Sequence, residues 1–194
     1  LRGQSITRKN DTISCFVALA GWNDSLTANL QWHNVRSELT HAGEVLLRSH
    51  LSRRDERLQA DIHLLPTQIV LQNTPFDLHA ADIHTDFQQV VVDQLNIESD
   101  RQRIFVEGTA SKSEDDAIAV DLQNISLDFV STLIPPTTPI TFGGEVSGTA
   151  SIRRAFDRPI VLANVSGESF SFNDAYLGSV RAQSWWNNAT TSLD

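Results

Sequence analysis

Sulfur-containing residues are almost missing from the sequence, and their absence excludes several kinds of site. The 194 residues include one cysteine, Cys15, so neither an intrachain disulfide nor a thiolate metal cluster can form. Methionine is absent, even at the first position, and the chain begins and ends within patterned sequence. We therefore expect a segment of a longer polypeptide.

Long apolar runs are missing as well. No run approaches the ~20 residues that a membrane-spanning helix requires, and residues 1–10 lack the apolar core of a signal peptide. We expect that this sequence does not enter a membrane by itself. At 40% hydrophobic residues it can nevertheless bury apolar side chains, which argues against disorder.

Positive charge is scarce. Lys and Arg total 15 against 24 Asp and Glu, and the formal net charge is -9, so no basic stripe is available to neutralise phosphates. We expect no nucleic-acid partner. The densest basic run, Arg53, Arg54 and Arg57, is interrupted by Asp55 and Glu56, which favours a solvated hairpin turn over a binding patch.

The sequence is rich in alternation of apolar and polar residues, which places successive side chains on opposite faces of a β-strand. Residues 26–32 are apolar at every even position and polar at every odd one. The same pattern recurs in residues 58–64, 76–80 and 118–122, with turn-forming residues between the runs. We predict an all-β fold of meandering antiparallel hairpins, with at most one short helix, for which residues 125–133 are the best candidate.

Proline marks the clearest interruption. Three prolines within residues 135–139 cannot continue a helix or a central strand, so we predict a loop or seam there within a single segment spanning residues 1–194. Alternation resumes in residues 142–150, with glycine where the earlier strands carry bulky side chains. Such glycines are typical of bulges and bends.

Motifs for chemistry are weak. The six histidines show no ligand spacing typical of zinc enzymes, and His63 and His79 fall on the polar phase of their strands. The acidic residues 114–116 follow Ser111 to Ser113 between two alternating runs, which favours a hairpin tip over a calcium or acid/base site. No nucleophile elbow, phosphate loop or dinucleotide fingerprint occurs. We expect no enzyme activity, no metal and no cofactor.

Several segments resemble the AsmA-like/TamB family. An alternating strand ending in glycine and small residues occupies residues 104–111, and an acidic turn leads to the strand 117–122. A proline-containing break is followed by the glycine-spaced strand 142–152, and then by Pro159 and a further strand. Residues 170–180, in which a glycine precedes a new strand, resemble a segment that often follows in the family. The chain is similar to the family in this patterning over most of its length, from about Leu58 onward.

The resemblance implies a long curled antiparallel-type sheet folded into an open apolar groove, similar to a taco. It also implies a periplasmic, envelope-spanning protein of a diderm bacterium, anchored in the inner membrane. Its expected role is non-enzymatic: phospholipid transport and outer-membrane biogenesis, including protein secretion and assembly. The expected partners are phospholipid acyl chains and, through the full-length protein, an outer-membrane β-barrel assembly protein.

The residues predicted to line the groove share the apolar phase of their strands. They are Leu26, Leu30, Val45, Leu47, Leu58, Ile62, Leu64, Leu71, Phe76, Leu78, Ile83, Val92, Leu95, Ile104, Val106, Ile118, Val120 and Leu122.

Two other readings stay open. A closed β-sandwich or a solenoid would bury the same residues as a core, and Trp22, Trp32, Trp185 and Trp186 could then form a platform for glycans in a binding or adhesion module. A β-helical enzyme acting on polysaccharide would share the β-rich pattern, but the sequence offers no convergent acid/base set for it.

Overall fold

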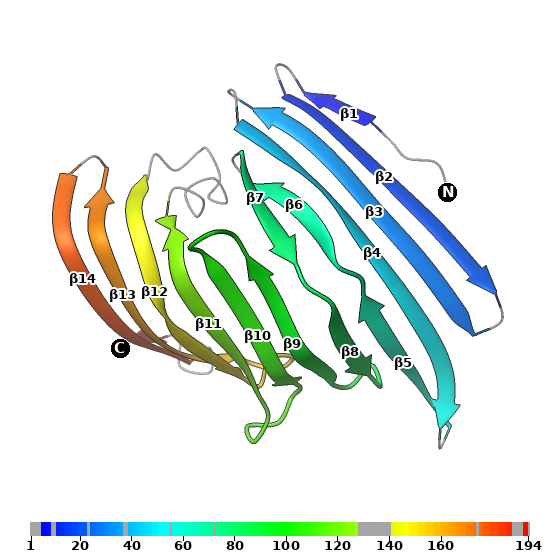
Figure 1. Cartoon of the computed structure of the whole chain (residues 1–194). Helices are drawn as coiled ribbons and strands as arrows, with labels where there is room; N and C mark the ends of the chain where they lie inside the picture. Colours follow the sequence, from blue (N-terminus) through cyan, green and yellow to red (C-terminus); the bar gives the residue numbers. More distant parts are fainter. Residues whose placement is uncertain are drawn as a thin grey trace. The chain divides into compact units, whose positions relative to one another are not determined.

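The structure is a computed structural model of the 194-residue chain. It describes residues 5–8, 11–22, 24–36, 39–54, 56–71, 73–127, 141–173, 175–187 and 192–193. Two compact units are present, residues 1–99 and residues 100–194. In the described part of each unit the strands lie side by side, in one curved antiparallel layer (Figure 1).

The first unit is a meander of strands β1 to β9. β2, β3 and β4 each pair antiparallel with the strand before and after them in sequence, and β5 pairs with β4 and β8. Their bounds are β1 Ser5–Arg8, β2 Asp11–Trp22, β3 Ser25–Arg36, β4 Leu39–Arg54, β5 Arg57–Leu64, β6 Thr67–Leu71, β7 Thr74–Leu78, β8 Ala81–Thr85 and β9 Val90–Glu98.

Two long strands of this meander are interrupted. β5 and β6 both pair with β4, and β7 and β8 both pair with β9, so each pair of short strands is one long strand with a break. Pro66, which has no N–H group, stands in the first break. A backbone hydrogen bond holds each break to the neighbouring strand. At the first break the Leu65 N–H donates to the Leu46 carbonyl of β4, and at the second the His79 N–H donates to the Asn96 carbonyl of β9.

The second unit continues the same plan without interrupted strands. Each strand pairs antiparallel with the next one in the chain. The bounds are β10 Arg103–Ala110, β11 Ala117–Ser126, β12 Phe142–Arg153, β13 Ile160–Phe172, β14 Ala175–Asn187 and β15 Ser192–Leu193.

Bulges keep the apolar residues on one face where the alternation fails. In β11 the register shifts between Leu122 and Ile125, and Asn124 takes a positive φ of 49°. The extra residue brings Ile125 to the face of Leu122, although the two are three positions apart. Ser169 in β13 (φ 52°) accompanies a similar shift between Gly167 and Phe170.

The predicted all-β fold of curled antiparallel sheet is confirmed. The hairpin turn predicted around Arg53, Arg54 and Arg57 falls between β4, which ends at Arg54, and β5, which begins at Arg57. The hairpin tip predicted at residues 114–116 lies in the connection between β10 and β11. Of the helix candidate 125–133, Ile125 and Ser126 belong to β11, and residues 128–140, including the predicted seam at 135–139, lie outside the described residues. No helix among the described residues is long and apolar enough to cross a membrane.

Candidate functional site

The candidate site is the apolar face of each unit, and backbone register defines it. Directly opposed residues of antiparallel strands project from the same face of the sheet. In the first unit Leu30 opposes Val45, and Leu47 opposes Leu64. One row farther along, Ile62 opposes Ile83.

The apolar face continues to the last strand of the unit. Ile83 opposes Val92 in β9. Phe76 opposes Ile69, and Leu78 opposes Ile97 across the interrupted strands.

In β9, the apolar side chains return to the apolar face after a residue with positive φ. Gln94 has a φ of 50°, and Leu95 lies two residues from Ile97 on the face of Leu78. Register therefore places the thirteen predicted lining residues of this unit on one face. These are Leu26, Leu30, Val45, Leu47, Leu58, Ile62, Leu64, Leu71, Phe76, Leu78, Ile83, Val92 and Leu95.

The second unit has a matching face. Register opposes Ile104 to Leu122 and Val106 to Val120, and Ile118 to Ile152 in the next strand. The five predicted lining residues of this unit, Ile104, Val106, Ile118, Val120 and Leu122, thus share one face.

Sequence reasoning missed the continuation of this face into β12, β13 and β14. Val161 opposes Ile152, and Val165 opposes Gly148. The run Ile160-Val161-Leu162 is apolar at three consecutive positions, so alternation alone cannot assign its phase, and only the register with β12 decides it.

An aromatic cluster also lies on this face. Phe142 opposes Phe172, with ring centroids 5.6 Å apart, and the Phe142 and Phe170 centroids are 6.3 Å apart. The register of β13 with β14 shifts between Gly167 and Phe170 and again between Phe170 and Ser171, which brings Phe170 into the group. No pattern in the sequence marks that phase change.

The apolar faces are packed but not covered. Within each unit, the described strands make extensive contacts only with strands to which they are hydrogen-bonded, so none of them forms a second layer over the sheet. Phe76, Leu78 and Ile125 are buried by their neighbours, whereas Leu30 and Leu58 are 39% and 50% exposed. Among the described residues no large side chain is fully buried. A closed core, which would seal these groups from any guest, is absent from the described part of either unit.

The opposite face of the first unit is polar and bonded across strands. His63 bonds to Asp82, His84 Nδ1 lies 2.7 Å from an Asp61 carboxylate oxygen, and Asn29 donates to Glu44 at 2.7 Å. The predicted exposure of His63 is confirmed, at 56% of its side chain. The histidine–carboxylate pairs connect residues about 20 positions apart, so no local spacing could have indicated them.

His79 is exposed as predicted and lies 2.7 Å from Glu98. Exposed pairs of this kind stabilise a protein by about 1 kcal/mol or less each. In the described residues, no group of three or more His, Cys, Asp or Glu side chains is arranged to hold a metal ion.

The acidic hairpin tip has a structural partner. Arg154 donates to Glu114 at 3.1 Å and to Asp157 at 2.9 Å, which joins the β10–β11 loop to the β12–β13 loop. The hydrogen bond to Asp157 is the main cause that raises the pKa of Arg154, with Glu114 adding to it. These contacts support the hairpin-tip prediction for residues 114–116.

Of the four tryptophans, Trp22 is 81% exposed at the end of β2, and Trp185 is 48% exposed in β14. The side chains of Trp32 and Trp186 lie outside the described residues.

Comparisons of the chain with protein-family models, with curated proteins and with solved structures find no match.

Proposed function

We propose that the chain is a non-enzymatic segment of an envelope-spanning lipid-transport protein, and that its apolar faces shield phospholipid acyl chains. The supporting observation is a sheet whose apolar residues gather on one face in each unit, with no layer of described residues packed upon that face. A sandwich-type binding module would need a second layer over that face, which the described part of each unit lacks.

The energetic reason is the cost of exposing fatty tails to water. At ~0.8 kcal/mol per methylene, an acyl chain of about 16 carbons costs on the order of 12 kcal/mol to leave a bilayer for water. A path across an aqueous compartment therefore needs apolar surface along its whole length. The 16-residue strand β4 alone spans roughly 50 Å at about 3.3 Å per residue.

The two faces of the sheet suit different surroundings. On the polar face, Asn29 donates a hydrogen bond to Glu44, and His63 bonds to Asp82. Alternate residues in the same strands are apolar and half-exposed, so a guest with fatty tails would remove apolar surface from water without displacing polar bonds.

The remaining parts of the proposal rest on the resemblance to the AsmA-like/TamB family. The segment belongs to a periplasmic protein anchored in the inner membrane of a diderm bacterium, and the sheet folds into an open groove. The full-length protein serves outer-membrane biogenesis and meets an outer-membrane β-barrel assembly protein at its outer end.

A matched pair of neighbouring valines tests the proposal. Val92 opposes Ile83 on the apolar face, whereas Val91 opposes His84 on the polar face. A photo-crosslinking residue placed at either position in the full-length protein, in cells, would report which face meets lipid. We expect phospholipid adducts at position 92 and not at position 91. Adducts at position 91 alone, or no lipid adduct at 92 in a functional protein, would contradict the proposal.

A further inference from the structure

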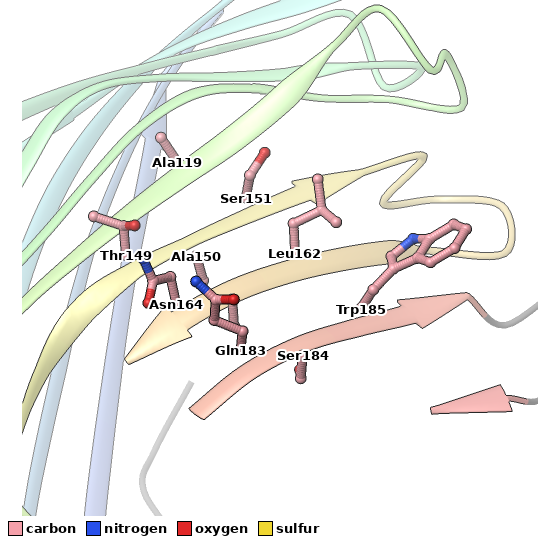
Figure 2. A pocket seen from close by; sticks show the side chains of 10 residues that line it. Ala119, Thr149, Ala150, Ser151, Leu162, Asn164, Gln183, Ser184 and Trp185 are labelled. Atoms are coloured by element: carbon pink, nitrogen blue, oxygen red, sulfur yellow. The ribbon is translucent and has the colours of Figure 1, made fainter. Parts of the chain in front are cut away.

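A concavity lies on the second unit, on the face of the sheet opposite its apolar face. It has a volume of about 590 Å³ and spans strands β11 to β14 (Figure 2). Ser151, Leu162 and Trp185 project into it from three successive strands. Its volume falls within the usual range for small-molecule sites.

Register separates this concavity from the apolar face. Leu162 opposes both Ser151 and Trp185, while its neighbour Val161 opposes Ile152 on the other side of the sheet. Because successive residues of a strand project to opposite faces, a ligand in the concavity does not touch the apolar face.

The lining combines two apolar surfaces with neutral polar groups. Leu162 and Trp185 are 42% and 48% exposed on this face. Asn164 opposes Gln183 beside them, and neither amide has a hydrogen-bond partner among the described residues. The residues that line the concavity carry no charge.

This chemistry selects among classes of ligand. A charged ligand would find no counter-charge in the lining, and a purely aliphatic one would leave the amides of Asn164 and Gln183 unpaired. A neutral sugar satisfies both requirements, because its C–H face packs against an indole ring and its hydroxyls bond to amide groups at the ring edge.

We propose that this concavity binds a neutral oligosaccharide, with Trp185 stacking on a sugar ring and Asn164 and Gln183 bonding to its hydroxyls. The protein would then hold fatty tails on one face of its sheet and a glycan on the other.

The test is a titration of the 194-residue chain with two probes, chitohexaose and cellohexaose, followed by calorimetry and saturation-transfer NMR. We expect at least one probe to bind saturably. Trp185→Ala should weaken binding about tenfold or more, and Gln183→Ala about threefold. Trp22→Ala, which removes an exposed indole from the first unit, should leave the affinity unchanged.

Trp185→Phe, which keeps a stacking ring, guards against a folding defect and should retain most of the affinity. Fatty-acid binding should survive in Trp185→Ala, so a failure of this site is distinguishable from a failure of the proposed lipid function. No saturable binding of either hexasaccharide up to about 10 mM, or equal binding by Trp185→Ala and the wild type, would overturn the proposal.

Discussion

Ile62→Arg places a guanidinium in the middle of the proposed lipid-binding face. Ile62 lies in β5 between Ser49 of β4 and Ile83 of β8, and Ile83 in turn opposes Val92. An acyl chain crossing this row would have to cover the new charge. No acidic side chain stands opposite it in either neighbouring strand.

The magnitudes for folding and for lipid binding differ, and this difference makes the variant informative. Ile62 is only partly buried, so replacing it should lower the free energy of unfolding by about 1 kcal/mol. Covering an unpaired guanidinium with hydrocarbon costs at least about 3 kcal/mol, which corresponds to roughly 100-fold weaker binding. The protein should stay folded and lose its lipid affinity.

The matched control is His63→Arg, which introduces the same side chain one position away. His63 lies on the polar face, is 56% exposed and bonds to Asp82, so an arginine there keeps an acidic neighbour. Titration with the fluorescent fatty acid cis-parinaric acid measures both variants, and urea unfolding checks their stability. We expect about 100-fold weaker binding for Ile62→Arg and an unchanged dissociation constant for His63→Arg. Equal affinities of the two variants would refute the reasoning.

Three further predictions concern stability. Gly148→Ala should destabilise the second unit by at least about 2 kcal/mol in urea unfolding, because the new Cβ would collide with the backbone carbonyl of Asn164; a loss below about 0.5 kcal/mol would contradict the close approach of β12 and β13. Asn124→Val should cost about 1–2 kcal/mol while Asn124→Gly costs less than half of that, since the bulge needs a positive φ; equal losses would exclude strain as the cause. Backbone N–H groups of Gln89 and Gln88 donate hydrogen bonds to the Asp86 carboxylate and lower its pKa. The ionised carboxylate therefore stabilises the fold at pH values above the unfolded-state pKa of about 3.9, and this contribution is lost as the pH falls through the lower pKa of the folded state. Asp86→Asn should therefore be less stable than the wild type at pH 7. The difference should shrink as the pH is lowered through the acidic range, and a difference that is independent of pH would contradict this origin.

Alternation predicted more of the fold than any motif did. The runs 26–32 and 58–64 lie within β3 and β5, and the apolar phase of each run is the face that register assigns. The prediction works because a period of two leaves one choice of face along an uninterrupted strand. Each such run could therefore be oriented without knowing its neighbours.

The phase changes could not be predicted in the same way. A residue is inserted at the break at Leu65 and Pro66 and at the bulge at Asn124, and the apolar phase also changes at Gln94. The positive φ at Gln94 and Asn124 arises in residues with side chains. Only pairing with the neighbouring strand shows that Leu95 and Ile125 return to the apolar face.

The concavity beside Trp185 could not be predicted from the sequence, because it also depends on the register between strands. Trp185 and Leu162 stand on the same face because β13 and β14 pair in one particular register, and the two residues are more than 20 positions apart in the chain. The cross-strand pair of His63 and Asp82 depends on register in the same way.

The most direct test of the lipid-binding face compares methyl groups that differ only in the side of the sheet on which they lie. Leu47 opposes Leu64 on the apolar face, while its neighbour Leu46 opposes Asn29 on the polar face, and Val92 and Val91 form a second such pair. A stearate that carries a nitroxide on its chain would be added to methyl-labelled protein, and line broadening would be recorded by NMR. We predict strong broadening of Leu47 and Val92 with little change at Leu46 and Val91. Equal broadening within each pair, or broadening of Leu46 and Val91 alone, would contradict the claim that fatty tails bind to this face.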